Sequence, residues 1–368
     1  MGLNCGIVGL PNVGKSTIFS ALTSAPAEAA NYPFCTIDPN VGIVAIPDER
    51  LDRIVELIPP RKVVPAIVEF VDIAGLVKGA SQGEGLGNRF LAHIREVGIL
   101  AHVVRCFENE DITHVSNEIN PIADIETIQV ELCLADLETV DKRIGRLEKL
   151  SRTGKEGAKQ AAAMEPLLKR LRDGLSEGQP ARSLGLSDDQ LKLIRDMHLI
   201  TMKPQIYVCN VDEAGLDGDN RYVEAVRTRA EAEASDVLVI CGQLEAEIAA
   251  LESDEERSEF LEEAGLKESG LNQLIHTAYS RLGLRTFFTA GADEDRAWTF
   301  HQGDTAPEAA GVIHTDFRKG FIKAEVYHCS DLFELKSEQQ VKAAGRLRIE
   351  GKEYLVRDGD IMHFRFNV

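Results

Sequence analysis

An α/β fold is predicted for this chain of 368 residues by three apolar, strand-like runs, each followed by polar or glycine-rich sequence. The first run, Asn4–Val8, leads into a glycine-rich loop and then into a helix-like run. The other two runs, at residues 65–71 and 205–209, are followed by Asp72 and Asn210. In α/β sheets the carboxyl ends of the strands form the ligand-binding edge, so these polar residues are candidate site residues.

The glycine-rich loop, residues 9–17, reads GLPNVGKST and fits the phosphate-binding pattern G-x-x-x-x-G-K-[ST]. In this pattern backbone N–H groups turn toward phosphate oxygens, and the Ser16 hydroxyl binds Mg²⁺. Lys15 reaches the β- and γ-phosphates and offsets the charge that develops there. An ordinary glycine-rich turn is the alternative, but the order of strand, loop and helix favours a nucleotide site.

Composition and charge exclude several classes of protein. Hydrophobic residues make up 44% and charged residues 27%, as in globular proteins, and no apolar run reaches membrane-spanning length. Seven scattered cysteines without a C-x-x-C pair argue against disulfides and zinc, and the N-terminus lacks signal-peptide features. The net charge of −19 predicts repulsion from nucleic acid and anionic membranes. We therefore expect a cytoplasmic protein with no membrane and no DNA partner.

A second motif, D-x-x-G, occurs as Asp72–Gly75 directly after the second strand. We expect Asp72 to hold Mg²⁺ through its water shell and the Gly75 N–H to meet the γ-phosphate. The next segment, 78–87, carries four glycines and is interpreted as a switch that senses this phosphate; a plain surface loop is the alternative. Between the two motifs, Thr36 is the best candidate to complete the Mg²⁺ coordination.

The segment after the third strand departs from the guanine-specific pattern N-K-x-D. Asn210 is kept, Val211 replaces the lysine, and Glu213 occupies the position of the aspartate. Because glutamate is one methylene longer, its paired hydrogen bonds to guanine are misplaced, and base discrimination is lost. We expect ATP to be accepted, and guanine binding stays open if Glu213 adjusts.

The position that usually carries a water-orienting residue is occupied by an apolar one. Leu76 follows the D-x-x-G motif where many GTPases carry a water-orienting glutamine, and leucine cannot position water. Hydrolysis is therefore expected to be slow, or to depend on a group from elsewhere in the chain or on a partner. His114 is one candidate, because it follows the strand-like run 102–107 toward the carboxyl edge of the sheet. An ordinary loop histidine is the alternative.

Five segments together resemble YchF, the Obg-like ATPase family, over essentially the whole chain. The segments are Gly9–Thr17, Asn31–Ile37, Asp72–Leu76, Gly83–Gly87 and the N-x-x-E of residues 210–213. The combination of N-x-x-E with Leu76 separates this subfamily from Obg proper. The resemblance implies a Ras-like P-loop domain, interrupted by an antiparallel helical coiled-coil hairpin and followed by a β-grasp (ubiquitin-like) TGS domain.

The resemblance also implies an activity and partners. It implies slow, Mg²⁺-dependent hydrolysis of ATP, preferred over GTP and stimulated by ribosomal subunits or whole ribosomes, in translation or a stress response. A monovalent cation such as K⁺ is a further candidate cofactor. By similarity, the phosphate contacts are Asn12, Val13, Gly14, Lys15, Ser16 and Thr17. Ser16 and Thr36 bind Mg²⁺, Asn210 and Val211 line the base pocket, and His114 matches a loop histidine thought to assist hydrolysis.

The middle of the chain changes from strands to a helical pattern after Asp124. Apolar residues recur at three- and four-residue steps along 130–147 and again along 161–175, which is typical of a coiled-coil seam. Two such helices, joined by a glycine-containing break, are predicted to fold back as an antiparallel hairpin. A third short helix is predicted to start at Ser187, with Gln190 completing a capping box.

The predicted hairpin is a basic part of an acidic chain. From Lys142 to Arg172 there are ten Lys or Arg against three Glu, a net charge of +7. A protruding basic tip is what contact with RNA phosphates requires, and a solvated helix face is the alternative. We therefore expect the ribosome to bind through this hairpin and the TGS domain.

From about Leu282 the chain is β-rich again. Runs at 285–289, 321–326, 354–356 and 361–366 are predicted strands. We interpret this part as a small binding module, with a purely structural role as the alternative. The expected domains are a P-loop domain at 1–124 and 200–281, a helical coiled-coil insertion at 125–199, and a TGS domain at 282–368.

Three functions fit these observations. The leading one is a slow, Mg²⁺-dependent ATPase that acts as a switch on the translation apparatus. A conventional GTPase is the second, and competition between ATP and GTP separates the two. The third is a nucleotide-gated adaptor that binds a protein and hydrolyses nucleotide only incidentally. Ribosome co-sedimentation at two salt concentrations tests it, because binding to RNA phosphates weakens steeply with salt.

Overall fold

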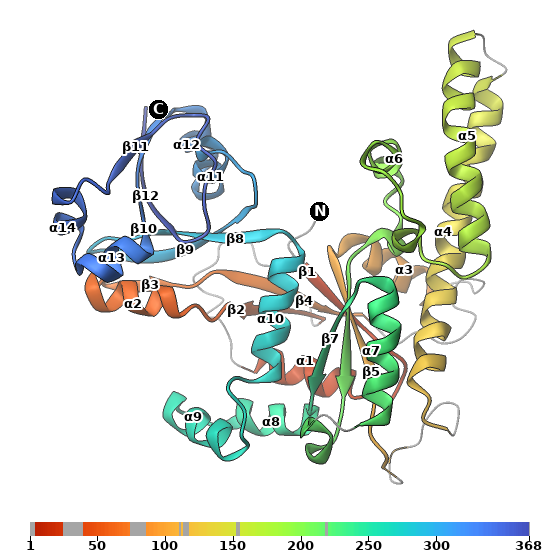
Figure 1. Ribbon diagram of the computed structural model, residues 1–368, viewed down its shortest axis with the longest axis horizontal. Helices are drawn as coiled ribbons and strands as arrows, with labels where there is room; N and C mark the ends of the chain where they lie inside the picture. Colours follow the sequence, from red (N-terminus) through yellow and green to blue (C-terminus); the bar gives the residue numbers. More distant parts are fainter. Residues whose placement is uncertain are drawn as a thin grey trace. The chain divides into compact units, whose positions relative to one another are not determined.

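The computed structural model describes residues 4–24, 40–73, 86–109, 112, 118–151, 155–217 and 220–367. These residues form two compact units, which are described separately below (Figure 1). Unit 1 comprises the described residues of 1–25, 38–42 and 69–274. Unit 2 comprises those of 43–68 and 275–368.

Unit 1 contains most of a six-stranded sheet with the order β2-β4-β1-β5-β6-β7, and the boundary between the units falls within β2 and β4. Its strands are β1 (Asn4–Val8), β2 (Val41–Ala45), β4 (Ile67–Asp72), β5 (Ile99–Arg105), β6 (Gln205–Asn210) and β7 (Asp236–Ile240). The pairs β1–β4, β1–β5, β5–β6 and β6–β7 are parallel. Every residue of β5 and β6 is buried, as expected for central parallel strands with both faces covered. The predicted strands at 4–8, 65–71, 102–107 and 205–209 correspond to β1, β4, β5 and β6, with shifted ends.

Besides a helical hairpin, seven α-helices lie in the described part of unit 1 or begin there, and several have the local signals that start a helix. They are α1 (Lys15–Thr23), α3 (Leu86–Glu96), α6 (Asp188–Ile194), α7 (Arg221–Glu233), α8 (Gly242–Ala250), α9 (Asp254–Glu263) and α10 (Gly270–Arg281), which continues into unit 2. The predicted capping box at Ser187 and Gln190 is present at the start of α6. A core of apolar side chains from β5, β6, α7 and α8 includes Val104, Tyr207, Val226 and Leu244.

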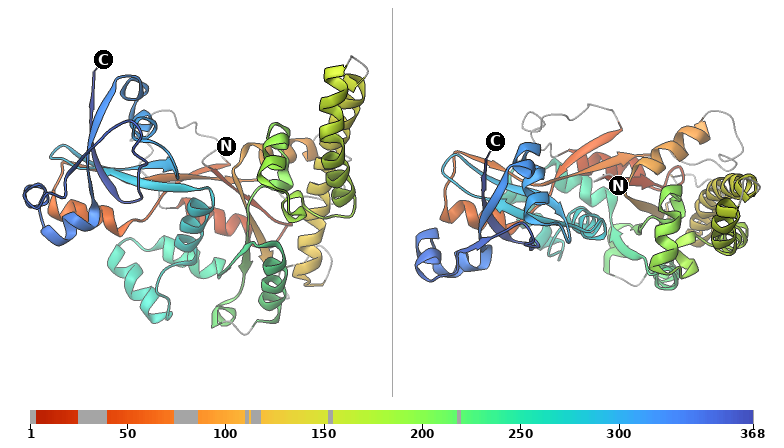
Figure 2. Two further views of the ribbon diagram at one scale, coloured as in Figure 1. Left: turned by 45° about the horizontal axis from the view of Figure 1, so that its top comes forward. Right: turned by 90° about the horizontal axis from the view of Figure 1, so that it is seen from above.

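Two long helices, α4 (Pro121–Ser151) and α5 (Lys155–Ser176), form a hairpin in unit 1. They lie side by side in all views (Figure 2). Their shared buried seam contains Cys133, Val140, Leu147, Met164, Leu168, Leu171 and Leu175. These are residues of the two predicted heptad runs, so burying the apolar stripe of each helix against the other explains the pairing.

Buried polar contacts hold the base of the hairpin to the rest of unit 1. Asp136 of α4 accepts hydrogen bonds from the backbone N–H of Ile200 (2.9 Å) and from both the N–H and the hydroxyl of Thr201 (2.7 Å each). Arg182 pairs with Glu233 of α7 at 2.9 Å. Lys203 donates to the carbonyls of Arg95 and Val97 at the end of α3. The middle of α4 and the segment after α5 are therefore attached to the rest of unit 1.

Unit 2 contains a second six-stranded sheet with the order β11-β10-β12-β8-β9-β3. Its strands are β3 (Lys62–Val64), β8 (Leu284–Thr289), β9 (Glu294–His301), β10 (Phe321–His328), β11 (Arg348–Glu350) and β12 (Asp360–Phe366). Its helices are α2 (Glu49–Leu57), α11 (Ala306–Ile313), α12 (Thr315–Lys319), α13 (Cys329–Leu335) and α14 (Glu338–Ala343). The pairs β8–β9, β10–β12 and β10–β11 are antiparallel, and β12–β8 and β3–β9 are parallel.

Unit 2 includes residues 43–68, which the sequence analysis assigned to the P-loop domain. β3 adds to the sheet edge at β9. From α2, the Arg50 guanidinium pairs with Asp358 at 2.8 Å, and that of Arg53 lies 4.0 Å from the centroid of the Phe333 ring. These long-range contacts have no local signature in the sequence.

The predicted strand at 354–356 is wrong. The backbone of this segment bonds to the loop before α11 and makes an isolated bridge between Leu355 and Thr305. Tyr354 accepts from the Ala306 N–H at 2.8 Å, and Val356 donates to the Asp304 carbonyl at 3.0 Å. Its hydrogen bonds are therefore used by a loop and not by a strand ladder.

Two further observations concern the whole described chain. Among the helices in the described ranges, none combines the length and apolar character needed to cross a membrane. The six cysteines in these ranges are buried and carry free thiols.

Candidate functional site

The phosphate-binding loop between β1 and α1 depends on a glycine. Gly14 has a φ of +91° at the start of α1, and Asn12 also has a positive φ, of +62°. A Cβ atom on Gly14 would lie 2.0 Å from the side-chain nitrogen of Asn210. Only glycine combines this backbone conformation with so close an approach of another chain segment.

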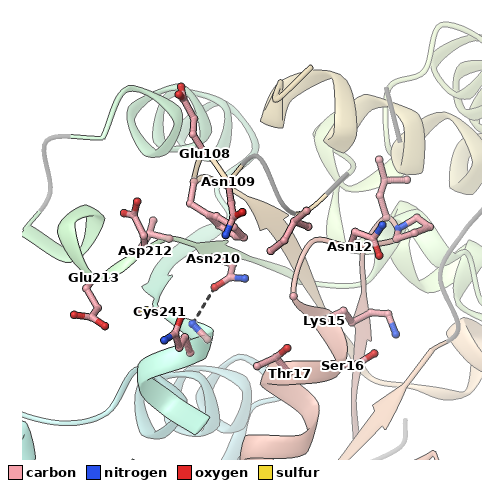
Figure 3. A pocket seen from close by; sticks show the side chains of 18 of the residues that line it. Asn12, Lys15, Ser16, Thr17, Glu108, Asn109, Asn210, Asp212, Glu213 and Cys241 are labelled. Carbon is pink, nitrogen blue, oxygen red and sulfur yellow. Dashed lines mark hydrogen bonds between the residues drawn. The ribbon is translucent and has the colours of Figure 1, made fainter. Parts of the chain in front are cut away.

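Asn210, at the end of β6, braces the loop (Figure 3). Its side-chain N–H donates to the Val13 carbonyl at 2.9 Å, and its side-chain oxygen accepts from the Gly242 N–H at 2.9 Å. The side chain is buried, so these bonds are shielded from water. Asn210 thereby joins the phosphate-binding loop to the start of α8.

Lys15 and Asp72, from the two predicted motifs, meet in the structure. The Lys15 ammonium donates to Asp72 at the end of β4 in a largely buried ion pair. Ser16 and Thr17 follow Lys15 in the first turn of α1, and both are exposed. The two motifs therefore converge at the carboxyl edge of the sheet, as expected from the strand order.

The donor atoms in this corner fit Mg²⁺. The Ser16 hydroxyl and the Asp72 carboxylate are hard oxygen ligands, and Mg²⁺ in nucleotide sites uses one or two carboxylates together with phosphates. Within the ranges that the structure describes, no group of three or more His, Cys, Asp or Glu could hold a metal by itself.

A cavity of about 900 Å³ opens over the loop. Its lining residues come from four loops at the sheet edge: Leu10, Pro11, Asn12, Gly14, Lys15, Ser16, Thr17, Phe107, Glu108, Asn109, Ile112, Asn210, Val211, Asp212, Glu213, Ala214, Cys241, Gly242 and Gln243. This volume lies within the range of small-molecule and cofactor sites.

The end of the cavity away from Lys15 and Ser16 carries negative charge (Figure 3). Asp212 and Glu213 lie there, both exposed, and the Asp212 carboxylate accepts from the Gly215 N–H at 2.9 Å. Burial, with smaller contributions from these two carboxylates, raises the pKa of the Cys241 thiol. Because the Asp212 carboxylate accepts from the Gly215 N–H, it closes a local turn, whereas Glu213 lines the cavity.

Val211 lines the same cavity, but its side chain belongs to the core. It is 3% exposed, and its backbone N–H donates to the Ile240 carbonyl at 2.9 Å. Val211 therefore contributes little exposed side-chain surface to the cavity.

The site residues predicted from the sequence divide into two groups. The structure brings together at one cavity Asn12, Gly14, Lys15, Ser16, Thr17, Asn210, Val211 and Glu213. The Val13 carbonyl accepts the hydrogen bond from Asn210, and Asp72 is connected to the cavity by its ion pair with Lys15. Three predicted residues lie outside the described residues: Thr36, Gly75 and His114.

One wall of the cavity was expected from the sequence and another was not. The loop after β5, which leads toward His114, was predicted to lie at the carboxyl edge of the sheet, and Phe107, Glu108, Asn109 and Ile112 of this loop line the cavity. The turn 241–243 after β7 was not predicted, although it follows a strand at the same edge. It carries no motif of its own.

Two family models match the chain. One, described as "50S ribosome-binding GTPase", matches residues 4–135. The other, YchF-GTPase_C, described as "Protein of unknown function (DUF933)", matches residues 284–367.

Full-length relatives are also similar. "Ribosome-binding ATPase YchF" of Bacillus subtilis (strain 168) is 55% identical over 370 residues, and that of Escherichia coli O157:H7 is 52% identical over 368. Each match covers 100% of both chains. A solved structure, that of the Schizosaccharomyces pombe YchF GTPase, superposes with a TM-score of 0.89 at 39% identity. It covers 99% of this chain and 98% of that one.

The parallel sheet, the phosphate-binding loop and its cavity define the class: a P-loop nucleotide-binding protein with the GTPase fold. The full-length relatives define the family within that class. The chain belongs to the YchF family.

Proposed function

We propose that this chain is a ribosome-binding ATPase that binds ATP in the cavity over the P-loop and hydrolyses it slowly. The observation that carries the proposal is the convergence of Lys15 and Asp72 beside a loop braced by Asn210. The names of the curated relatives support both the ribosome and ATP as partners. The protein then acts as a cytoplasmic nucleotide switch in translation or a stress response.

In this proposal each P-loop residue has a distinct task. The backbone N–H groups of residues 12–17 bind phosphate oxygens, and Lys15 offsets charge on the β- and γ-phosphates. Its pairing with Asp72 keeps both charges neutralised until phosphate oxygens compete for the ammonium. Ser16, Asp72 and Thr36 would hold Mg²⁺, which neutralises phosphate charge when it is bound with the nucleotide. A monovalent cation such as K⁺ is a further candidate.

The chemical step is assigned to residues near the γ-phosphate. The Gly75 N–H binds the γ-phosphate and couples it to the segment that follows. His114 orients or deprotonates the attacking water, because Leu76 has no polar group for that task. His114→Ala should lower turnover on the order of 10²-fold while ATP affinity stays constant.

A control and a contrary result complete this test. His301→Ala removes an exposed histidine of unit 2 and should leave turnover unchanged. If His114→Ala hydrolyses ATP at the parental rate both with and without ribosomes, another group orients the water.

ATP selectivity is assigned to the Asn210–Glu213 segment. Glu213 borders the cavity at the end away from Lys15, with one methylene more than the guanine-binding aspartate. Glu213→Asp should raise GTP affinity relative to ATP in direct competition, and Glu231→Asp, an exposed change on α7, should not. A conventional GTPase would instead prefer GTP before any substitution.

Ribosome binding is assigned to the α4/α5 hairpin, which we infer to be the coiled-coil insertion at 125–199, and to a TGS domain at 282–368. The order β9-β8-β12-β10-β11, with α11 after the first hairpin, supports a β-grasp arrangement. Co-sedimentation with ribosomes should fall steeply between low and moderate salt, because it depends on RNA phosphates. Ribosome binding that does not change with salt concentration would favour the alternative function, an adaptor that binds a protein partner.

A further inference from the structure

Arg105, the last residue of β5, is a large charged side chain buried beside the cavity. It is 1% exposed, and its strand partner in the sheet is Asn210, which braces the P-loop. Neither the P-loop motif nor the D-x-x-G motif includes it. A buried guanidinium costs several kcal/mol unless polar groups surround it, so its contacts indicate what it is used for.

The guanidinium of Arg105 donates to three backbone carbonyls of the loop that follows it. Nε bonds the Phe107 oxygen at 3.2 Å, Nη2 the Asn109 oxygen at 3.0 Å, and Nη1 the Ile112 oxygen at 2.9 Å. The Cζ atom of Arg105 also lies 4.6 Å from the centroid of the Phe107 ring. One side chain therefore fixes Phe107, Asn109 and Ile112 relative to the end of β5.

That loop is one wall of the nucleotide cavity. Phe107, Glu108, Asn109 and Ile112 all line it. Glu108 and Asn109 lie on the opposite side of the cavity from Thr17 and Cys241 (Figure 3). Three of the four residues that line the cavity from this loop use their carbonyl to bind Arg105, so the position of the wall depends on the guanidinium.

The same guanidinium also interacts with the base of the α4/α5 hairpin. Asp124, in the first turn of α4, is 4% exposed and supplies negative charge near Arg105. The start of the loop is held as well, because the Asn220 side chain donates to the Cys106 carbonyl at 2.7 Å. Asn220 therefore anchors the start of the loop, and the charge of Asp124 favours the buried guanidinium at its other side.

We propose that Arg105 is a positioning residue that holds Phe107, Asn109 and Ile112, which line one wall of the nucleotide cavity, at the end of β5. It acts through the loop and not by touching the nucleotide. Arginine is required because its planar fork donates in three directions at once, whereas a lysine ammonium is a single point on a flexible stem. This inference rests on the proposed nucleotide site.

The test compares Arg105→Lys with the parent in titrations with a fluorescent ATP analogue. The variant keeps the charge beside Asp124 but loses the fork, so at least one buried carbonyl of the wall is left without its donor. The analogue should therefore bind on the order of tenfold more weakly. Hydrogen exchange should rise in peptides covering 106–112 and stay constant elsewhere. Arg227→Lys, the same change at an exposed ion pair of α7, is the matched control.

Each outcome decides between the alternatives. A folded Arg105→Lys that binds the analogue within twofold of the parent, with unchanged exchange over 106–112, overturns the proposal. A parent protein that does not bind the analogue overturns the proposed function instead. If Arg105→Lys does not fold, Asp124→Asn serves as the second variant, because it removes the neighbouring charge without changing the side-chain volume. It should raise exchange in the same peptides, and unchanged exchange there would count against the proposal.

Discussion

Asn210 shows how one residue can serve two elements of a nucleotide site. The sequence identified it as part of a base-recognition segment. The structure adds that its amide bonds the Val13 carbonyl and the Gly242 N–H, and that it approaches Gly14 closely enough to exclude a Cβ. Substituting Asn210 would therefore disturb the phosphate loop as well as the proposed base pocket.

Lys15 is the residue on which nucleotide affinity should depend most. Lys15→Ala removes the charge that faces the β- and γ-phosphates and leaves Asp72 without its partner. We expect ATP affinity to fall on the order of 10²-fold or more, measured by calorimetric titration with Mg²⁺ present. Lys149→Ala, at an exposed position of α4, should bind ATP like the parent. Undiminished affinity in Lys15→Ala would contradict the P-loop assignment.

His102 of β5 is buried in its neutral form. The side chain is 2% exposed, and this burial lowers the pKa of His102 to about 3. The positive charge of Arg182 lowers this pKa further, and the negative charge of Glu233 partly offsets that effect. Its Nδ1 lies 3.0 Å from the side-chain nitrogen of Gln205. The Gln205 oxygen accepts from Arg182 at 2.8 Å, so the amide nitrogen faces His102, whose Nδ1 must be the unprotonated acceptor.

This burial makes unfolding sensitive to acid. The unfolded state takes up a proton below a pKa of about 6.5 and the folded state does not, so this contribution to stability is present at neutral pH and is lost as the pH falls. From pH 7.5 to 5.5 the loss should be about 1.4 kcal/mol. His102→Gln should lack this component in urea unfolding at the two pH values. If parent and variant lose the same stability, His102 is not the responsible group.

At the scale of elements, the α4/α5 hairpin combines a local pattern with distant attachments. Its seam follows from heptad spacing within each helix. Its orientation on unit 1 depends on Asp136, which binds the chain 64 and 65 residues later, and on the Arg182–Glu233 pair. Burial raises the pKa of Asp136, although the bonds from Thr201 and Ile200 oppose this.

The exposed cations of the hairpin should govern its affinity for ribosomes. Changing Arg146, Lys149 and Lys159 to glutamine removes three positive charges from exposed positions. Ribosome co-sedimentation should weaken and lose part of its salt dependence, while ATP affinity stays constant, because these residues are absent from the cavity. The matched control changes Arg221, Arg227 and Lys267, which are exposed in unit 1 but off the hairpin. Equal losses in both variants would mean that net charge, and not the hairpin, is responsible.

At the scale of the whole molecule, charge is unevenly distributed. The chain carries −19 overall and +7 between residues 142 and 172. Long-range repulsion therefore opposes any polyanion that cannot engage the hairpin specifically.

Free duplex DNA should accordingly fail to bind. In a mobility-shift titration with a random duplex at physiological salt, we expect binding weaker than about 10⁻⁴ M, the weak end for non-specific DNA binding. Ribosomes at the same salt should co-sediment with the protein. Tight DNA binding would contradict the interpretation that overall charge limits the hairpin to its proposed partner.

The sequence by itself determined the features that depend on neighbours in the chain. The phosphate loop follows from glycine and lysine spacing, the capping box of α6 from Ser187 and Gln190, and the hairpin seam from heptad period. The strands β1, β4, β5 and β6 follow from short apolar runs. Each of these signals is carried by residues a few positions apart, where backbone geometry alone relates them.

Only the tertiary structure decided which distant residues meet. The bonds of Asn210 span 197 and 32 residues, and β3 pairs with a strand of the C-terminal part of the chain. The segment 354–356 has the composition of a strand, yet its hydrogen bonds are taken by the loop before α11. Arg105 looks like an ordinary strand end in the sequence, and its role depends on the three carbonyls that fold back over it. Burial and hydrogen-bond satisfaction act across the whole fold, so no local pattern encodes them.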